Sequence, residues 1–323
     1  MSKVKVGVVG GAGYVGGEMI RLLLHHDQCD LSFVSSRSQA GRALHEVHPD
    51  LTGWTELSFI DSYESDVDVL FLCMGHGKSK IYLDKSTVNE DTLIIDLSRD
   101  YRLKKDAEGF VYGLCELNKS LITKSKKIAN PGCFATCIQL GLLPLATHQK
   151  INSDIHLTAI TGSTGAGQNP IATTHNSWRN NNISIYKPFT HQHLGEVEQS
   201  IKQLQTDHKG DINFIPMRGS FTRGIFASMY LESDLSEEEA YQIYEAYYKD
   251  SPFVHISKNP ISVKEVVNTN NGKIFISKHK NKLRIESAID NLLKGAAGQA
   301  VQNMNLVMGW KENTGLKLKG SAF

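Results

Sequence analysis

Short apolar runs that alternate with helix-like stretches organise the first part of the chain. Val4 to Val9 is the first run, and the leucine-rich stretch Glu18 to His25 is predicted as a helix. Further buried strands are predicted at Leu31 to Val34, Val67 to Cys73 and Thr92 to Leu97. Strands that alternate with helices in this way are typical of a doubly wound parallel sheet, so an α/β, Rossmann-like domain is expected.

Beyond Cys133 the pattern changes to short strands with fewer helices between them. Strands are predicted at His156 to Ile160, Ile212 to Ile215, Gly224 to Leu231, Val263 to Val267, Lys273 to Ser277 and Lys282 to Ile289. Leu235 to Tyr248 is predicted as a helix that Ser236 caps. This pattern indicates a second, α+β domain with a mainly antiparallel sheet, after which a helix from Val301 to Met308 is expected to return to the first domain.

The predicted division is a dinucleotide-binding domain over residues 1–133 and about 298–323, and a catalytic, substrate-binding domain over residues 134–297. A length of 323 residues suits about two domains.

The formal net charge of +1 gives no bulk field that favours nucleic acid or an anionic membrane. The 5 scattered cysteines have no zinc-like spacing and fit a reducing, cytoplasmic setting, and we expect no signal peptide, membrane span or metal.

A glycine-rich turn joins the first predicted strand to the first helix. Glycines at positions 11, 13 and 16 match the spacing G-x-G-x-x-G. Such a turn lets the backbone approach a pyrophosphate at a helix N-terminus. We therefore predict cofactor contacts along the whole turn, at Gly10, Gly11, Gly13, Tyr14, Val15 and Gly16. A turn that only packs a helix on a sheet is the alternative.

Polar residues at the end of the second strand indicate which dinucleotide binds. An NAD site usually places an acidic residue here, but this chain has Ser36, Arg37 and Ser38. Because arginine makes charge-assisted bonds to a 2′-phosphate, NADP(H) is favoured over NAD. Gly75, in the loop after the strand that ends at Cys73, is expected to lie over the pyrophosphate or the nicotinamide.

Two arginines follow the strand that ends near Leu97. Arg99 and Arg102 lie at the carboxyl end of a predicted parallel strand, where α/β proteins bind ligands. Either is a candidate to hold an anionic substrate, and a pair of surface ion pairs is the alternative.

The turn Asn130-Pro131-Gly132 delivers Cys133 to the start of an apolar, helix-like run. Proline lacks an N–H donor and glycine can adopt a positive φ, so a sharp bend is expected here. Unpaired N–H groups and the dipole at a helix N-terminus stabilise an anion, and the thiolate is the nucleophilic form of cysteine. Cys133 is therefore a candidate nucleophile, with an inert buried cysteine as the alternative.

A histidine followed by a glutamate is the best candidate for proton transfer. If the chain is helical from Leu194 onward, Glu196 shares a face with His193. A carboxylate beside an imidazole fixes its tautomer and stabilises the imidazolium. Exposed histidines at an ordinary helix start are the alternative.

Taken together, these motifs resemble the N-acetyl-γ-glutamyl-phosphate reductase family, which is related to aspartate-semialdehyde dehydrogenase. The resemblance runs from Val4 to about Leu306 and rests on the glycine turn, Asn130 to Thr136, Gly162 to Gly167, the His193/Glu196 pair, Thr222 to Gly224, and Asp290 to Ala300. It implies an NADPH-dependent acyl-phosphate reductase of arginine biosynthesis that forms a homodimer or homotetramer through its second domain.

The resemblance also assigns residues. Cys133 would be the nucleophile, His193 the acid/base and Glu196 its orienter. Further positions follow from the family motifs: cofactor contacts at Ser163, Gly165 and Asn291, and substrate contacts at Arg99, Arg102, Asn130 and Arg223. The thiolate would attack the acyl phosphate and expel phosphate, and the resulting thioester would be reduced to the semialdehyde.

The chain departs from the family pattern in its predicted pocket. Arg218 is an extra basic residue before Thr222, and the polar loop 173–182 carries Trp178 and Arg179. The family name implies an acetyl group, whereas these additions would suit a larger, anionic acyl group such as succinyl, and both stay open. An aspartyl-phosphate reductase and a non-catalytic NADP-binding sensor are the alternative functions.

Overall fold

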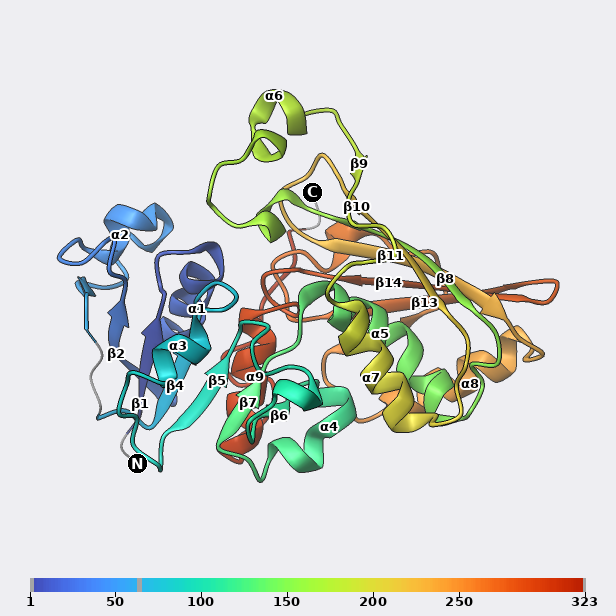
Figure 1. Ribbon diagram of the computed structural model, residues 1–323, viewed down its shortest axis with the longest axis horizontal. Coiled ribbons are helices and arrows are strands. Elements are labelled where there is room, and N and C mark those ends of the chain that lie inside the picture. Colours follow the sequence, from blue (N-terminus) through green and yellow to red (C-terminus); the bar gives the residue numbers. More distant parts are fainter. Residues whose placement is uncertain (1–2, 63–65, 322–323) are drawn as a thin grey trace. The chain divides into compact units, whose positions relative to one another are not determined.

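The computed structural model describes residues 3–62 and 66–321, which divide into two compact units (Figure 1). The first unit comprises residues up to Pro131 together with Ala296–Lys317, and the second comprises Gly132–Gly295 together with the chain from Leu318 onward. Ala296 and Ala297 therefore belong to the first unit where we expected the second. Two parts belong to the second unit where we expected the first: Gly132 with Cys133, and the residues from Leu318 onward. The latter follow from hydrogen bonds, because the Ser321 amide donates to the Val267 carbonyl at 3.3 Å.

A seven-stranded sheet forms the first unit, and every neighbouring pair in it is parallel, as predicted. Its strands, in spatial order, are β3 (Phe59–Ile60), β2 (Cys29–Ser35), β1 (Val4–Val9), β4 (Val69–Leu72), β5 (Leu93–Asp96), β7 (Lys127–Ala129) and β6 (Val111–Tyr112). Val8 on the central strand pairs with Val34 and Phe71, and all three side chains are buried, as continuous apolar runs in parallel sheets require.

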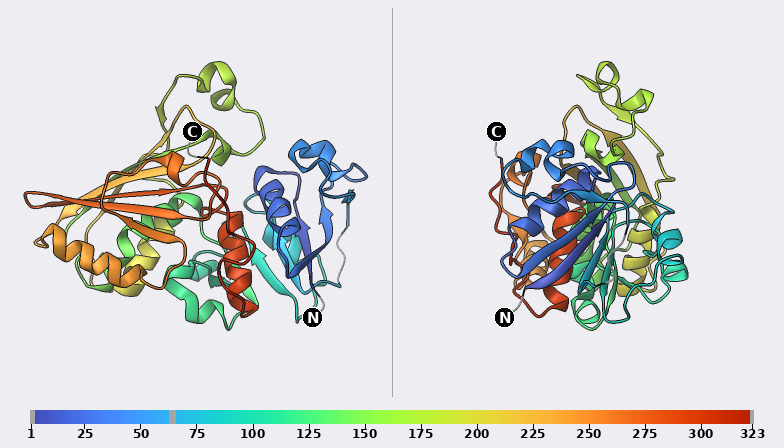
Figure 2. Two further views of the ribbon diagram at one scale, coloured as in Figure 1. Left: turned by 180° about the vertical axis from the view of Figure 1, so that it is seen from behind. Right: turned by 90° about the vertical axis from the view of Figure 1, so that its left-hand side faces the viewer.

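Helices cover this sheet and include the predicted return of the chain. The helices are α1 (Tyr14–Leu24), α2 (Leu44–Val47), α3 (Ser79–Leu83), α4 (Cys115–Ile122) and α9 (Ala297–Val307). The last of them, α9, belongs to the first unit and packs against α1 and α4 (Figure 2). Helix α1 begins four residues earlier than the leucine pattern alone indicated, at Tyr14 rather than Glu18.

The second unit contains a mixed seven-stranded sheet. Its strands, in spatial order, are β12 (Val254–Ser257), β13 (Gly272–His279), β14 (Lys282–Ile289), β11 (Ile225–Glu232), β8 (Ile155–Thr161), β10 (Ile212–Arg218) and β9 (Ser184–Ile185). Only the neighbours β12–β13 and β8–β10 run parallel, so the sheet is mainly antiparallel, as predicted. Helices α5 (Cys133–Thr147), α7 (Leu194–Leu204) and α8 (Glu237–Tyr248) pack on one face (Figure 1).

Helix α5 is the centre of this unit's core, because it is apolar on every side and almost completely buried. Pro144 lies inside it and cannot donate to the carbonyl of Leu140, four residues earlier. The Tyr248 hydroxyl of α8 donates to that carbonyl at 2.6 Å instead. The neighbouring helix thus satisfies the acceptor that the proline would leave unpaired.

One predicted strand is wrong and one predicted cap is confirmed. Val263–Glu265 is a 3₁₀ turn, because the Glu265 carboxylate accepts from the Ser262 amide at 2.7 Å and closes a capping box around it. Ser236 caps α8 as expected, with its hydroxyl accepting from the Glu239 amide at 3.2 Å. The local S-x-x-E spacing therefore outweighs the β-branched composition of the first segment.

Residues 170–189 form an arm that stands away from the sheet of the second unit (Figure 1). The predicted loop 173–182 contains two short helical turns, η4 (Ala172–Thr174) and α6 (Asn176–Arg179), and the arm returns through β9. Throughout the described parts of the chain, no helix combines the length and the apolar character needed to cross a bilayer.

Candidate active site

Cys133 is the first residue of α5. Its N-terminal neighbour Gly132 has φ −72° and ψ 151°, so the bend before the cysteine is made with extended backbone and not with the positive φ that we expected. The thiol is partly exposed, and the first turn of the helix carries no acidic side chain. This position beside unpaired helix N–H groups favours the thiolate form.

The first half of the turn is fixed within the first unit. Asn130 is buried, its amide donates to the Ala296 carbonyl at 3.1 Å, and its oxygen accepts from Asn303 at 3.1 Å. Arg102 is also buried and donates from Nε to the Asn130 carbonyl at 2.9 Å and from Nη2 to the Leu97 carbonyl at 2.9 Å. These bonds position the turn, and the substrate contacts that we predicted for both residues stay a prediction.

The second half of the turn is fixed by Glu196. Its Oε2 accepts from the Gly132 amide at 2.9 Å, and its Oε1 lies 3.9 Å from Nε2 of His193. His193 and Glu196 are both buried, and α7, which follows His193, packs along α5. One carboxylate therefore contacts both the residue before the nucleophile and the imidazole, a link that the sequence did not indicate.

A tight loop packs against the nucleophile from another side. A Cβ atom at Gly295 would lie 2.8 Å from Cβ of Cys133, so only glycine fits here. The buried carboxylate of Asp290 anchors this loop, because it accepts from the Leu292 and Leu293 amides at 2.8 and 3.0 Å. Sequence reasoning missed Gly295, since its role depends on a neighbour that is distant in the chain.

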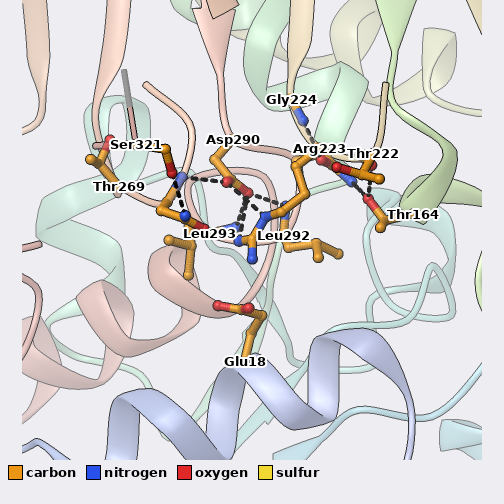
Figure 3. Close-up of polar contacts among 12 residues, drawn as sticks. Glu18, Thr164, Thr222, Arg223, Gly224, Thr269, Asp290, Leu292, Leu293 and Ser321 are labelled. Carbon is orange, nitrogen blue, oxygen red and sulfur yellow. Dashed lines mark hydrogen bonds and ion pairs between the residues drawn. The ribbon is translucent and has the colours of Figure 1, made fainter. Parts of the chain in front are cut away.

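Arg223 pairs with the same carboxylate (Figure 3). Its Nε and Nη2 atoms lie 3.1 and 3.2 Å from the two oxygens of Asp290, in a bidentate arrangement. Asp290 therefore holds this guanidinium in place, and the substrate contact that we predicted for Arg223 stays a prediction.

The side chain of Asn291 bonds to two other loops of the second unit. Its oxygen accepts from the Gly224 amide at 2.7 Å, and its amide donates to the Thr164 hydroxyl at 3.0 Å. That hydroxyl donates to the Thr222 carbonyl at 2.7 Å. The side chain of Asn291 thus holds the loop that carries Ser163 and Gly165, which are partly and fully exposed respectively.

The second cysteine of α5 differs from the first. Cys137 is completely buried, and its thiol donates to the Ser287 carbonyl at 3.3 Å. Burial raises the pKa of Cys137 to about 12. Because only the thiolate attacks, Cys137 is chemically inert beside Cys133.

An aromatic cluster surrounds the catalytic candidates. His191 lies with its ring centroid 4.7 Å from that of His193 and 5.3 Å from that of Phe134. Its Nδ1 accepts from the His193 amide at 3.2 Å. Burial lowers the pKa of His191 to about 4, and the charges of Lys187 and Arg218 act in the same direction. His191 is therefore neutral near neutral pH.

The depressed pKa of His191 predicts acid lability. In the unfolded chain the His191 imidazole binds a proton below pH 6.5, whereas in the folded protein it does so only below about pH 4. The free energy of unfolding is therefore unaffected by His191 above pH 6.5 and decreases as the pH falls from 6.5 toward 4. In denaturant titrations at pH 7.5 and 4.5, His191→Asn should reduce the loss of unfolding free energy between the two pH values by about 2 kcal/mol. Equal losses in both proteins would contradict the neutral His191.

The glycine turn of the first unit has the geometry that a dinucleotide site needs. Gly10 has φ +81°, and a Cβ atom at Gly16 would lie 2.5 Å from the Gly11 carbonyl oxygen, so both positions require glycine. A Cβ atom at Gly13 would meet nothing within 4 Å, which leaves space beside the N-terminus of α1. Helix α1 begins at Tyr14, whose side chain is exposed. The first turn of α1, which includes Val15, carries no acidic side chain.

A histidine that the sequence did not single out supports this turn. His48 is buried, and its Nε2 lies 2.8 Å from the Gly11 carbonyl oxygen. A Cβ atom at Gly17 would lie 2.8 Å from the same ring, so helix and histidine fit together only at glycine.

The residues predicted to select NADP follow β2. The hydroxyls of Ser36 and Ser38 are 3.5 Å apart, and Arg37 between them is exposed. Within the described ranges 3–62 and 66–321, Arg37 makes no ion pair, in contrast to Arg42, which pairs with Glu46 at 3.2 Å. The arrangement leaves the Arg37 guanidinium available to an anionic ligand.

Asp100 shapes the loop that contains Gly75. Its carboxylate accepts from the Gly77 and Ser79 amides at 2.7 and 3.1 Å and so caps the start of α3. Gly75 and Arg99 are both exposed, and the Arg99 amide donates to His76 at 3.2 Å. Arg99 is thus the predicted substrate arginine whose side chain lies in solvent.

An open cavity of about 570 Å³ lies on the arm of the second unit, away from these groups. It is lined by Pro170, Ile171, Ala172, Thr174, His175, Ser177 and Trp178. Of the residues that we predicted for the substrate pocket, only Trp178 and its neighbours in the loop 173–182 line it. The catalytic geometry described above, and not this cavity, therefore defines the candidate site.

Comparison with known families agrees with both units. Residues 5–125 match the family described as semialdehyde dehydrogenase, NAD binding domain, and residues 133–291 match semialdehyde dehydrogenase, dimerisation domain. Among solved structures, aspartate semialdehyde dehydrogenase II of Vibrio cholerae has a TM-score of 0.75 at 16% identity and covers 96% of this chain and 99% of its own. That of Candida albicans, solved with NADP, has a TM-score of 0.69 at 14% identity and covers 97% and 100%. The TM-scores show that this chain shares the fold of both structures.

Curated relatives are much closer in sequence. A protein of Phocaeicola vulgatus named N-acetyl-gamma-glutamyl-phosphate reductase is 55% identical over 321 residues, which are 99% of this chain and 100% of the relative. One of Parabacteroides distasonis with the same name is 55% identical over 322 residues, with 99% and 100% covered. With such identity along its whole length, this chain belongs to the N-acetyl-gamma-glutamyl-phosphate reductase family of semialdehyde dehydrogenases.

Proposed function

We propose that this protein reduces an N-acyl-γ-glutamyl phosphate to the N-acylglutamate 5-semialdehyde and phosphate with NADPH, in arginine biosynthesis. The observation that carries the proposal is the linkage of Cys133 and His193 through Glu196, whose carboxylate oxygens lie 2.9 Å from the Gly132 amide and 3.9 Å from the imidazole. A nucleophile, a proton carrier and its orienting carboxylate are the groups that this chemistry requires.

The first unit supplies a fitting cofactor site. The open space at Gly13, the N-terminus of α1 and the exposed Arg37 suit the pyrophosphate and the 2′-phosphate of NADPH. Gly75 of the first unit, and Ser163, Gly165 and Asn291 of the second, stay our proposed cofactor contacts. When bound, NADPH supplies the hydride that reduces the thioester carbonyl.

The protein's own residues perform the remaining steps. The Cys133 thiolate attacks the acyl phosphate carbon, the carbon–oxygen bond to phosphate breaks, and a thioester is left on the sulfur. After reduction, the oxyanion collapses, the carbon–sulfur bond breaks, and the semialdehyde leaves with the thiolate restored. His193 moves the protons. Arg99 and Arg223 stay our proposed contacts for the substrate's anionic groups.

Backbone groups at the start of α5 are placed to stabilise the oxyanion. The first ladder bond of α5 runs from the Thr136 amide to the Gly132 carbonyl at 2.8 Å, so the Phe134 and Ala135 amides precede the helix ladder. Such groups, fixed beside the nucleophile, stabilise developing negative charge without reorganisation.

The choice of cofactor should depend on Arg37. Replacing it with leucine removes a charge-assisted bond to the 2′-phosphate and should raise KM for NADP(H) by roughly 10- to 100-fold, with little change in the weak activity with NAD(H). Arg42→Leu, which removes an exposed arginine already paired with Glu46, is the matched control. An equal effect of Arg37→Leu on both cofactors would show that this residue does not read the 2′-phosphate.

A reverse assay tests the proposed reaction directly. The semialdehyde is supplied with phosphate and NADP, and NADPH formation is followed for N-acetylglutamate, N-succinylglutamate and aspartate semialdehydes. Phosphate-dependent turnover of an N-acylglutamate semialdehyde is expected. Turnover of aspartate semialdehyde alone would assign the sister reaction, and tight NADP binding without any turnover would assign a sensor.

We further propose that the protein works in the cytoplasm as a homodimer or homotetramer assembled through its second unit. The arm of that unit exposes large apolar side chains, with Trp178, Ile183, Ile185 and Phe189 between 48% and 58% exposed. Such a patch is typical of an interaction surface. Sedimentation equilibrium should give a mass of two or four chains, and a monomer at micromolar concentration would refute the assembly.

A further inference from the structure

Two arginines of the second unit lie where their charges are not balanced. Arg179 ends α6 and is only 9% exposed, and Arg218 ends β10 and is partly buried. In the part of the chain that the structure describes, neither makes an ion pair with a carboxylate. Burying a cation without a counter-ion is energetically unfavourable. Two neighbouring buried or partly buried arginines without a carboxylate partner therefore indicate a site for an anionic ligand.

Both guanidinium groups are held in place by neutral groups. Arg179 donates from Nη2 to the Gly219 carbonyl at 2.6 Å, and Arg218 donates from Nη1 to the Thr173 hydroxyl at 3.3 Å. The Arg218 guanidinium also lies 4.1 Å from the ring centre of Tyr186, in a cation–π contact. These contacts fix the orientation of each guanidinium group, but they do not neutralise its positive charge.

The two arginines are close enough to repel each other. Burial lowers the pKa of Arg179, and the charge of Arg218 lowers it further. A bound carboxylate would remove this repulsion, because it accepts bidentate bonds from guanidinium groups and supplies the missing negative charge.

Tyr186 connects the arginine pair to the catalytic residues. Its ring, stacked with Arg218, lies 6.5 Å from that of Phe134, the residue after the nucleophile, and 5.6 Å from that of His191. Burial raises the pKa of Tyr186, and so does the charge of Cys133, whereas the charges of Arg218 and Arg179 oppose the shift. Tyr186 thus lies between the Arg218 guanidinium and the residue that follows Cys133, so the arginine pair lies near the catalytic residues of the second unit.

We propose that Arg179 and Arg218 bind a carboxylate at the end of the substrate's N-acyl group, so that this enzyme prefers an acyl group derived from a dicarboxylic acid, such as succinyl, over acetyl. The inference rests on the proposed function. Every N-acylglutamyl phosphate carries an α-carboxylate and a phosphate, for which Arg223 and Arg99 are available. The additional charge of Arg218 matches a third anionic group, which acetyl lacks and succinyl has.

The test compares kcat/KM for N-succinyl- and N-acetylglutamate 5-semialdehyde in the reverse direction, with phosphate and NADP. The wild-type enzyme should prefer the succinyl substrate by at least ~10-fold, and Arg218→Met should lower its kcat/KM by roughly 100-fold, mainly through KM, while the acetyl substrate changes by less than ~3-fold. Arg218→Lys should recover part of the succinyl activity. Arg284→Met is the matched control, because Arg284 of β14 also lies over an aromatic ring, 5.9 Å from the centre of Phe275. It should leave kcat/KM unchanged for both substrates.

The outcomes separate the subsite from the reaction itself. A wild-type preference for the acetyl substrate overturns the proposal, and it does so without relying on any variant. Equal losses on both substrates in Arg218→Met also overturn it, because they assign the pair to the α-carboxylate or phosphate that both substrates share. Failure of the wild-type enzyme on both substrates, with NADP still bound, refutes the proposed function instead.

Discussion

Replacing Cys133 with serine should abolish turnover and leave NADP binding unchanged. A serine hydroxyl stays protonated at the start of α5, so it cannot attack as the thiolate does, and kcat should fall by at least ~10³-fold. The cofactor contacts proposed for the glycine turn and Arg37 belong to the first unit, whereas Cys133 belongs to the second. Steady-state kinetics, together with a fluorescence titration of NADPH, measures the two properties separately.

Cys137 provides the matched control for this substitution. It belongs to the same helix but is completely buried, and burial raises the pKa of its thiol to about 12. Cys137→Ala should therefore keep activity within a few-fold of wild type and remain alkylated by iodoacetamide at one fast-reacting site, whereas Cys133→Ser should lose that site. Substantial activity in Cys133→Ser, or the loss of fast alkylation in Cys137→Ala, would reverse the assignment of the two cysteines.

Replacing His193 with asparagine should have the second largest effect. Asparagine keeps a polar side chain of similar size but cannot carry the proton, so kcat/KM should fall by roughly 10²- to 10⁴-fold. The loss should appear in kcat more than in KM, and the ionisation assigned to His193 should disappear from the pH–rate profile. An unchanged profile would show that another group transfers the proton.

Glu196→Gln tests how the carboxylate contributes to this step. The amide oxygen of glutamine can still accept from the Gly132 amide, which Glu196 binds at 2.9 Å, but the charge beside His193 is lost. We expect a smaller fall, roughly 10-fold, with the pH–rate profile displaced toward lower pH because the imidazolium is less stabilised. A loss as large as that of His193→Asn, accompanied by lower thermal stability, would instead assign Glu196 a mainly structural role.

Much of the fold follows from local sequence patterns. Val4–Val9 forms a strand with the predicted bounds, because a β-branched run before a glycine turn has one good conformation. The start of α5 at Cys133 follows equally from the Asn-Pro-Gly turn. In contrast, Val263–Glu265 has the composition of a strand, but hydrogen bonds of a capping box make it a 3₁₀ turn.

Positions whose role depends on distant neighbours were harder to interpret. Arg102 and Asn130 were predicted to bind substrate because polar residues at strand ends often do so. The structure shows that their donors and acceptors hold the turn before Cys133, with Asn303 of α9 contributing from the far end of the chain. Gly295 and His48 gave no sequence signal, since each matters only through packing against another segment.

The sequence by itself determined the two kinds of sheet, the glycine turn, the cysteine at the start of α5 and the proximity of His193 to Glu196, because each of these depends on short-range spacing that a few neighbouring residues specify. Only the tertiary structure decided that Glu196 bonds to Gly132 and that Cys137 is buried. It also decided that Arg218 lies over Tyr186 while Arg179 bonds to the neighbouring Gly219 carbonyl, with no ion pair to either arginine within residues 3–62 and 66–321. These features depend on burial and on charges that are brought together from separate segments, and no periodicity in the chain encodes them.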